Sequence, residues 1–539
     1  MRVYTARPMA NPDKTSNDRS DSQPGASQKG SLTSVIAASS VGTLIEWYDF
    51  YIFGSLSAVL AKQFFPPENA TLGYISTLAL FATGFIVRPF GALVFGRIGD
   101  LVGRKYAFLM TLLMMGGSTF AIGLIPGYAQ IGVLAPMIVL LLRLTQGLAL
   151  GGEYGGAATY VAEHSPDDKR GLMTSYIQTT ATLGFFVSIL VILGLQSSIP
   201  KAAFEDWGWR IPFLLSALLV LVSYSIRRKL QESPLFQEMK SQGAGSKNPL
   251  KDSFGNAANL KLVALALFGA TMGQGVVWYT GQFYAQAFMA KVLNIESIQT
   301  NTIIAVSLLL ATPLFIVFGA LSDKVGRKKL MMAGCFLAAV CYVPIFNMMA
   351  AQANIDSKTI SLGGMAQQGE PKVDVAKKDD AEKQIKAGDI VTETTFLVTF
   401  SDGSSAKKVV RDVRKPDSNE QKTTSSWIDK KLNSRSVMTL IGLVFILVTF
   451  VTMFYGPIAA FLVELFPTKI RYSSMSLPYH IGNGVFGGLV PVIAISMVSA
   501  THSPIAGLYY PVGIAVVTFV IGSIFLPDRR GVRLSDDTV

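Results

Sequence analysis

One ten-residue motif occurs twice in this chain, 223 residues apart, and each copy follows a long apolar run. The first copy begins at Gly96 and the second at Gly319, with Gly, Asp, Gly, Arg and Lys in register. Self-similarity at a fixed offset indicates two homologous halves. A duplicated apolar bundle with a charged connection at the same place in each half is typical of membrane transporters. The repeat therefore disfavours a soluble enzyme.

The apolar runs are long enough to cross a lipid bilayer. Half of the residues are hydrophobic, only 15% are charged, and the mean hydropathy is +0.41. A spanning helix needs about 20 mostly apolar residues, and the alternating pattern of a membrane β-barrel is absent. The sequence predicts an all-α polytopic membrane protein. Its twelve predicted spans cover approximately residues 35–60, 73–96, 105–125, 131–161, 172–196, 210–227, 259–289, 300–322, 330–350, 436–465, 472–498 and 504–526.

Lysine and arginine gather in every second connection between the predicted spans. The positive-inside rule assigns such connections to the cytosol, which places both termini and the central linker there. Most of the net charge of +12 then serves orientation in the bilayer, and no nucleic-acid partner is expected. The predicted domains are a disordered cytosolic tail at 1–31, a six-helix half at 32–228, a cytosolic linker at 229–258, a second half at 259–351 and 436–527, an insertion at 352–435, and a cytosolic tail at 528–539.

The insertion is located by a second motif that the two halves share. Glu163 with Arg170 in the first half parallels Glu464 with Arg471 in the second, at an offset of 301 residues rather than 223. The difference of 78 residues matches the hydrophilic block at 352–435. The charge pattern places this block outside the cytosol.

The inserted block contains a pattern typical of paired strands. Residues 390–400 are rich in Val, Thr and Phe, and Ser401, Asp402 and Gly403 follow before a second run at 407–413. Two such runs joined by turn residues predict a β-hairpin. We expect a small β-containing extracytoplasmic module.

Several motifs together resemble one family of transporters. The repeated motif resembles the signature of the major facilitator superfamily, and Arg143-Leu144-Thr145-Gln146-Gly147 resembles the signature of its fourth helix. Four more stretches resemble its metabolite:proton symporter branch: Glu46-Trp47-Tyr48-Asp49-Phe50, Arg88-Pro89-Phe90-Gly91, Gly151-Gly152-Glu153-Tyr154-Gly155-Gly156 and Trp207-Gly208-Trp209-Arg210-Ile211-Pro212-Phe213. That branch includes permeases for alpha-ketoglutarate, shikimate, citrate and proline or betaine. The resemblance implies a twelve-helix fold in a bacterial inner membrane, with a small-molecule site between the halves, and we expect a monomer.

Ionisable residues inside the predicted spans are candidates for proton coupling, because each costs about 2.5–3.5 kcal/mol to insert. Glu46 and Asp49 are three residues apart, on one face of the first span. Asp49 with Arg143 resembles the coupling pair of sugar–proton symporters, so we expect Asp49 to carry the proton and Arg143 to tune it. Glu46, Arg88 and Glu153 are neighbouring candidates. The alternative is a permanent salt bridge that holds the first half together.

The two shared motifs form a predicted cytosolic gate. The resemblance implies that this cluster holds the halves together in the outward-open state, with basic residues near acidic ones. The candidate gate residues are Gly96, Asp100, Gly103, Arg104, Lys105, Glu163 and Arg170 in the first half, and Asp323, Gly326, Arg327, Glu464 and Arg471 in the second. The alternative is that the basic residues only orient the chain.

Polar and aromatic side chains within the spans are candidates for a substrate cavity. Residues 274, 278 and 282 lie four apart, on one helical face. Arg88 and Arg210 are candidates for contact with an anionic substrate. The alternatives are an internal ion pair for Arg88, which is slightly favoured, and an interfacial anchor for Arg210 at a span end. His480 is expected to be a packing residue. The cavity candidates are Tyr51, Gln178, Gln274, Trp278, Gln282, Asn483 and Arg210.

These features predict proton-coupled uptake of a small organic acid or a zwitterionic osmolyte by alternating access. Two alternatives are open: a uniporter whose buried charges are structural, and a transceptor that signals through the insertion. No nucleophile–base set indicates an enzyme. Cys335, Cys341 and three scattered histidines give no metal site, so the proton is the only expected coupling species and no cofactor is expected.

Overall fold

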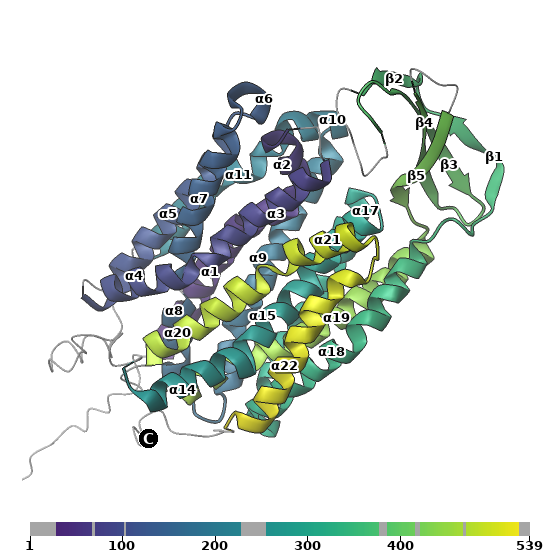
Figure 1. The fold of residues 1–539 in the computed structure, drawn as a ribbon. Helices are drawn as coiled ribbons and strands as arrows, with labels where there is room; N and C mark the ends of the chain where they lie inside the picture. The colour runs from purple at the N-terminus through teal and green to yellow at the C-terminus, as the bar shows by residue number, and fades with distance from the viewer. Residues whose placement is uncertain are drawn as a thin grey trace, which may run out of the picture.

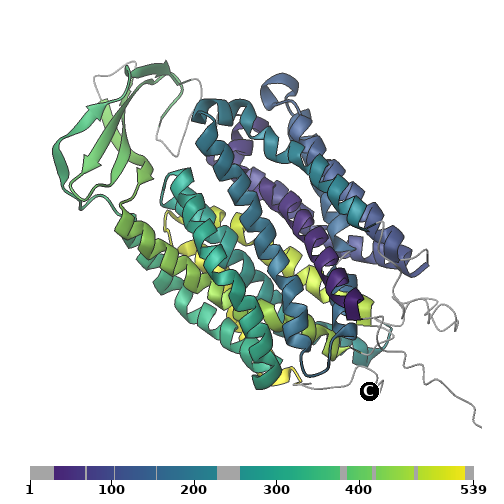
Figure 2. The ribbon, with the colours of Figure 1, turned by 180° about the vertical axis from the view of Figure 1, so that it is seen from behind.

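The computed structural model describes residues 29–66, 70–101, 104–152, 154–227, 255–376, 385–415, 421–466 and 471–527. Within these ranges the chain forms a long helical bundle with a small β-sheet at one end (Figures 1 and 2). We call this the sheet end of the bundle, and the other the opposite end.

The first half of the bundle is built from helices that run between the two ends. They are α1 (Lys29–Ser55), α2 (Ser57–Phe64), α3 (Ala70–Ile86), α4 (Arg88–Leu101), α5 (Arg104–Leu124), α6 (Tyr128–Ile131), α7 (Leu134–Gly151), α8 (Tyr154–His164), α9 (Arg170–Ser198), α10 (Lys201–Ala203), a π-helical turn η1 (Phe204–Gly208) and α11 (Arg210–Arg227).

The second half repeats this arrangement. Its first span consists of α14 (Ala257–Ala266), α15 (Met272–Tyr279) and α16 (Ala285–Ala287) together with three π-helical turns. The elements that follow are α17 (Ser297–Val325), α18 (Arg327–Gln352), α19 (Ser434–Leu465), α20 (Arg471–Ile481), η5 (Gly482–Gly487), α21 (Val490–Thr501) and α22 (Tyr509–Phe525). The halves meet where α9 packs against α17 and α19, and where α20 packs against α4 and α8.

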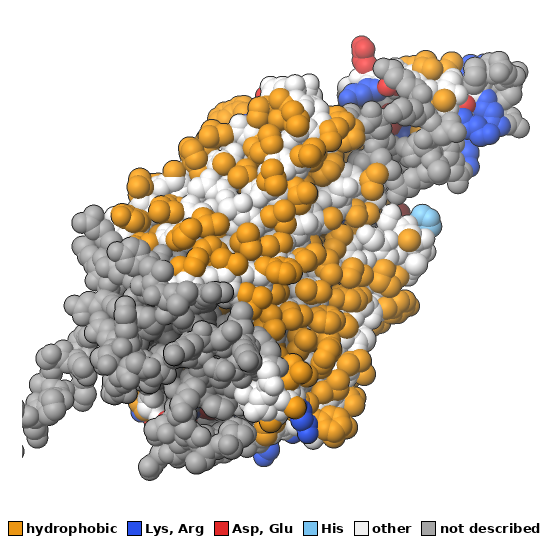
Figure 3. Space-filling model, turned by 60° about the vertical axis from the view of Figure 1, so that its left-hand side comes forward, with side chains coloured by type: hydrophobic (Ala, Val, Ile, Leu, Met, Phe, Trp, Pro, Cys, Tyr) orange, Lys and Arg blue, Asp and Glu red, His pale blue; other side chains and the backbone are white. Residues whose placement is uncertain are grey.

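The predicted membrane-spanning architecture is confirmed. In the part of the chain that the structure describes, nine helices are long and apolar enough to cross a bilayer, or ten if Lys201–Gly208 and Arg210–Ser225 form one bent span. Each of the twelve predicted spans coincides with a helix or with consecutive helices. Hydrophobic side chains also cover the flank of the bundle (Figure 3), as expected for contact with lipid.

The inserted block forms an antiparallel sheet, which confirms the predicted hairpin. Its strands are β1 (Ile360–Gln367), β2 (Lys372–Val375), β3 (Ile390–Phe400), β4 (Ser405–Arg414) and β5 (Gln421–Lys431). Strand order is β1-β3-β4-β5, with β2 also paired to β3. The hairpin is β3–β4, and Ile390 pairs with Arg414 at its open end.

The sheet is fastened to the second half through its last strand. Lys430 donates its backbone N–H to the carbonyl of Asn294 (2.8 Å), and its own carbonyl accepts from the N–H of Glu296 (2.9 Å). The side chain of Lys430 also donates to the carbonyl of Ala353 (3.1 Å). The two backbone bonds join β5 to the connection between the seventh and eighth spans, and the side-chain bond joins it to the end of α18.

A close seam of glycines brings α3 and α4 against α7. A Cβ on Gly147 would lie 2.1 Å from the carbonyl oxygen of Gly84, and one on Gly151 would lie 2.1 Å from that of Arg88. Only glycine permits this approach, because any side chain would overlap backbone atoms. The seam places Arg88, at the start of α4, directly beside α7.

Candidate functional site

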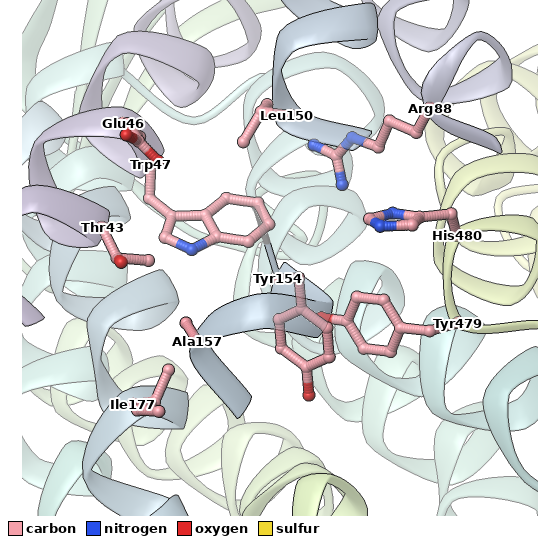
Figure 4. Close-up of a pocket in the computed structure, with 10 residues that line it drawn as sticks. All are labelled: Thr43, Glu46, Trp47, Arg88, Leu150, Tyr154, Ala157, Ile177, Tyr479 and His480. Carbon is pink, nitrogen blue, oxygen red and sulfur yellow. The ribbon is translucent and has the colours of Figure 1, made fainter. Parts of the chain in front are cut away.

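A small pocket lies between the two halves (Figure 4). Its free volume of about 20 Å³ is room for one water molecule. Only Tyr479 and His480, both on α20, come from the second half. The first half contributes Thr43, Glu46, Trp47, Arg88, Leu150, Tyr154, Ala157 and Ile177.

The Arg88 guanidinium projects into this pocket from the first turn of α4 (Figure 4). The residue is only 1% exposed. Its charged carbon lies over the rings of Phe85 (4.3 Å), Phe50 (4.6 Å) and Trp47 (5.2 Å), so three cation–π contacts stabilise it. Among the described residues, neither Nε nor Nη2 has a hydrogen-bond partner. The pocket therefore contains a buried cation with unused donors.

His480 lies beside Arg88 on the other side of the pocket (Figure 4). It is buried, and neither ring nitrogen has a hydrogen-bond partner within the part of the chain that is described. Its neighbour Tyr479 shares a hydroxyl hydrogen bond with Tyr455 (2.8 Å) and stacks on Tyr154 with 3.6 Å between ring centroids. This stack joins the halves on the side of the pocket that faces the opposite end.

Asp49 and Arg143, the predicted coupling pair, have different hydrogen-bond partners in this structure. Asp49 Oδ1 accepts from the hydroxyl of Ser216 on α11 (2.5 Å). Arg143 donates from Nη1 to Gln146 Oε1 (2.6 Å) and from Nη2 to the carbonyl of Phe81 (3.0 Å). Both charged residues are fully buried, but neither lines the pocket.

None of the predicted cavity residues is among those that line the described pocket. Tyr51 instead stacks on Trp278 (5.4 Å), and Phe283 packs on both rings. Phe81 and Phe185 also pack on Phe283. This cluster closes the pocket on the side that faces the sheet, because the halves are in contact there.

The predicted polar cavity residues are buried between helices. Asn483 donates to Gln274 Oε1 (2.7 Å), and Gln178 donates to the hydroxyl of Tyr154 (2.9 Å). Gln282 is fully buried, and neither atom of its amide has a partner among the described residues. Gln178 thereby contacts a side chain that lines the pocket.

Arg210 is an anchor at the sheet end rather than a cavity residue. Its Nη1 donates to the carbonyls of Gly123 (2.8 Å) and Ile125 (2.7 Å), and its guanidinium lies over the ring of Trp209 (4.4 Å). These contacts tie the start of α11 to the end of α5. They favour the interfacial anchor over contact with a substrate.

Sequence reasoning missed most of the residues that line the pocket. Trp47 and Tyr154 stand within motifs that the sequence singles out, so their positions carried a signal. His480 carried a weaker one, as a polar residue in an apolar span. Thr43, Leu150, Ala157, Ile177 and Tyr479 have no distinguishing pattern.

At the opposite end, a buried ion cluster joins the halves. One oxygen of Glu464, Oε1, accepts from Arg170 of the first half (2.8 Å) and from Arg327 of the second (3.1 Å). All three side chains are nearly fully buried. Arg170 also pairs with Asp167, which is half exposed. A single buried carboxylate therefore holds two guanidiniums from different halves.

Asp323 makes a second link between the halves beside this cluster. Its two oxygens accept from the backbone N–H groups of Gly171 and Leu172, at 2.9 Å each, at the start of α9. It also pairs with Arg327 (2.5 Å). Gly326 adopts a φ of 109°, which favours glycine and turns the chain between α17 and α18. The second copy of the repeated motif thus contacts the first half directly.

The structure describes the other predicted gate residues only in part. Arg471 is buried and donates from Nε to the carbonyl of Phe466 (3.1 Å). The surroundings of Gly96, Asp100, Arg104, Lys105 and Glu163 lie outside what the structure describes, as do Gly103 and Glu153 altogether.

At the sheet end, weaker polar contacts join the halves. Lys201 of the first half pairs with Asp429 of β5 (3.2 Å), which also binds Lys407 (2.9 Å), and Gln196 donates to Ser297 (3.3 Å). Partial burial raises the pKa of Asp429, but the hydrogen bonds and charges of Lys407 and Lys201 outweigh it and lower the pKa below its ordinary value. Asp429 therefore stays charged at neutral pH, and its ion pairs with Lys201 and Lys407 persist there. They are lost only when Asp429 is protonated, in acid below about pH 4.

The chain is similar to known transport proteins. A family model described as "Sugar (and other) transporter" matches residues 34–263. The alpha-ketoglutarate permease of Escherichia coli (strain K12) is 29% identical over 503 residues, which cover 93% of this chain and 95% of the permease. The proline/betaine transporter of the same strain is 28% identical over 503 residues, 92% of this chain and 83% of that protein.

Solved structures show the same fold at lower sequence identity. The proton:xylose symporter XylE, an MFS (major facilitator superfamily) protein, superposes with a TM-score of 0.63 at 14% identity, over 94% of this chain and 98% of that one. An inward open conformation of the xylose transporter XylE from E. coli gives a TM-score of 0.59 at 14% identity, over the same shares.

Proposed function

We propose that the chain is a transporter of the major facilitator superfamily, and that it carries a small organic acid or a zwitterionic osmolyte together with a proton. The relatives named for alpha-ketoglutarate and for proline or betaine suggest these two classes. Both classes carry a carboxylate. The observation that supports carboxylate binding is the buried, unsatisfied edge of Arg88.

The geometry of the Arg88 guanidinium suits a carboxylate. Nε and Nη2, the two nitrogens without partners among the described residues, lie on the same edge of the guanidinium plane. That edge can donate two parallel hydrogen bonds to the two oxygens of a carboxylate. An unsatisfied buried donor costs about 1–3 kcal/mol, and a bound carboxylate would remove this cost. The rings of Trp47, Phe50 and Phe85 hold the guanidinium in place.

We propose Asp49 as the proton carrier. Glu46 lines the pocket, and Asp49 follows about one helical turn later on α1. Asp49 Oδ2 has no hydrogen-bond partner among the described residues, while Oδ1 accepts from Ser216. A proton bound there would neutralise a buried charge without breaking an ion pair. Arg143, which is hydrogen-bonded to Gln146 here, would then tune Asp49 in another state of the cycle.

The proposed orientation follows from the charge pattern, with the opposite end in the cytosol and the sheet outside. Transport would then alternate between two openings. Outward opening parts the contacts at the sheet end and the aromatic cluster around Phe283. Inward opening parts the Glu464 cluster and the bonds of Asp323. The contacts between the halves at both ends of the bundle suit a stage of this cycle in which neither end is fully open.

The test is uptake into proteoliposomes under an inward proton gradient, with labelled malate, succinate, proline and glycine betaine as probes. Wild type should accumulate at least one of them above the external concentration. Arg88→Lys keeps the charge but loses the bidentate edge, so we expect uptake to fall at least about tenfold. Arg435→Lys, an exposed position at the start of α19, should behave as wild type.

Two outcomes would count against the proposal. Uptake that only equilibrates, whatever the proton gradient, would favour a uniporter. Undiminished uptake by folded Arg88→Lys would exclude the carboxylate contact at this residue. Protein yield and thermal stability in detergent separate both outcomes from a folding defect.

Opening at the sheet end gives a further prediction. Cysteines in place of Gln196 and Ser297, whose side chains are hydrogen-bonded across the halves, should be joined by a short bifunctional thiol reagent. The background is a variant in which Cys335 and Cys341 are replaced. Cross-linking should stop uptake if the halves separate there, and a reducible reagent should restore it once cleaved. Each single cysteine variant is the control, and full uptake by the cross-linked protein would contradict outward opening at this end.

A further inference from the structure

We infer that His480 binds a second polar group of the substrate, so that the pocket selects carboxylic acids with a hydroxyl or oxo group next to the carboxylate. The inference rests on the proposed carboxylate contact at Arg88 and adds a selectivity that this contact alone does not give. It assigns a substrate role to a residue whose position in an apolar span suggested only packing.

The placement of His480 carries the argument. The residue is 1% exposed and lines the pocket from α20. Both ring nitrogens lack hydrogen-bond partners among the described residues. Buried polar groups are nearly always paired, so an unpaired imidazole facing a pocket points to a ligand. Figure 4 shows its ring beside the Arg88 guanidinium, with both side chains directed into the same space.

The chemistry of the two side chains defines the ligand. Arg88 offers two donors on one edge, which suit a carboxylate. A neutral imidazole offers one donor and one acceptor, so it can bond either to a hydroxyl or to an oxo group. A substrate with such a group on the carbon next to the carboxylate satisfies both residues at once. Glycine betaine cannot, because its trimethylammonium group has no hydrogen-bonding atom.

The two residues come from different halves of the bundle. Arg88 starts α4 in the first half, and His480 lies on α20 in the second, where the two helices pack together. A substrate bonded to both would therefore favour the closed arrangement over either open one. A packing role for His480 is the competing explanation, since a backbone group of Gly151 lies near enough to act as a weak hydrogen-bond partner of the imidazole, although neither ring nitrogen makes a bond of normal geometry.

The experiment compares malate with succinate, which differ by one hydroxyl group, in the proteoliposome assay. Wild type should prefer malate in kcat/KM by about 10- to 100-fold. In His480→Phe this preference should fall below about threefold, while succinate uptake is retained. His480→Gln keeps a donor and an acceptor and should keep most of the preference. The ratio of two substrates in one preparation is insensitive to loss of folded protein.

Several results would overturn the inference. If His480→Phe keeps the wild-type preference for malate, His480 has a packing role, although the proposed function stands. If wild type carries glycine betaine but neither acid, the substrate class is wrong while Arg88 can still bind the carboxylate. If wild type carries none of the probes used, the proposed function fails and this inference fails with it.

Discussion

Replacing Glu464 with glutamine is expected to lower the rate of net uptake at least about tenfold and to open the end of the bundle opposite the sheet. In the structure one oxygen of Glu464 accepts from Arg170 and Arg327, which belong to different halves. Glutamine keeps an acceptor oxygen but removes the negative charge that the buried guanidiniums of Arg170 and Arg327 share. Removing one partner of a buried ion pair costs about 3–5 kcal/mol. Here the loss destabilises the arrangement in which the end opposite the sheet is closed. Distances between spin labels placed on the two halves at that end would measure the change.

The matched control is Asp167→Asn. Asp167 also pairs with Arg170, but its side chain is half exposed, so this contact is worth at most about 1 kcal/mol. We expect nearly normal uptake and unchanged label distances for this variant. If Glu464→Gln likewise leaves the distances and the uptake rate unchanged, the cluster is structural and does not control opening.

The two ends of the bundle differ in how firmly they are closed. At the sheet end the pair of Lys201 and Asp429 is largely exposed, with 66% and 32% of the two side chains accessible. Exposed pairs contribute about 0.2–1 kcal/mol. At the opposite end, the buried charges of Glu464 and the bonds of Asp323 must all part together. The polar contacts therefore hold the sheet end less firmly than the opposite end, and the aromatic cluster around Phe283 provides the remaining contact between the halves on that side.

The helices and the sheet were predictable because their signals are local. Each span is a long apolar run, and β3 is rich in Val, Thr and Phe before the turn that leads to β4. The repeat added a long-range signal: it pointed to Asp323 and Arg327, and the shared second motif pointed to Glu464. The structure brings these three residues together with Arg170.

The lining of the pocket was not predictable in the same way. Hydropathy gives the length of a helix but not its rotation about its own axis, which decides whether a side chain faces the pocket or a neighbouring helix. Asp49 faces Ser216 on α11, whereas Glu46, one turn earlier, lines the pocket. Gln274 and Trp278 share one helical face, as predicted, but that face packs on Asn483 and Tyr51. Such contacts follow from tertiary packing, which no single motif encodes.

Replacing Asp49 with asparagine is expected to separate substrate movement from proton movement. The asparagine amide can keep the hydrogen bond from Ser216 but cannot take up or release a proton. With one proton per substrate and the membrane potential held at zero, a symporter can accumulate substrate up to about tenfold for each pH unit of gradient. The variant should accumulate none, so the ratio of internal to external substrate falls to about one. Exchange of labelled for unlabelled substrate across the membrane should survive, because it needs no net proton transfer.

The control for this variant is Ser216→Ala, which removes the hydrogen bond but leaves the Asp49 carboxyl group. If the carboxyl group itself carries the proton, Ser216→Ala should still accumulate substrate, while its dependence on external pH shifts. If Asp49→Asn still accumulates substrate to the wild-type ratio, the proton is carried elsewhere, and Glu46 in the pocket becomes the next carboxylate to replace. If Asp49→Asn loses exchange as well as accumulation, while it remains folded, Asp49 is needed for movement of the halves. Accumulation and exchange measured on one preparation therefore distinguish a proton carrier from a residue that only holds the bundle together.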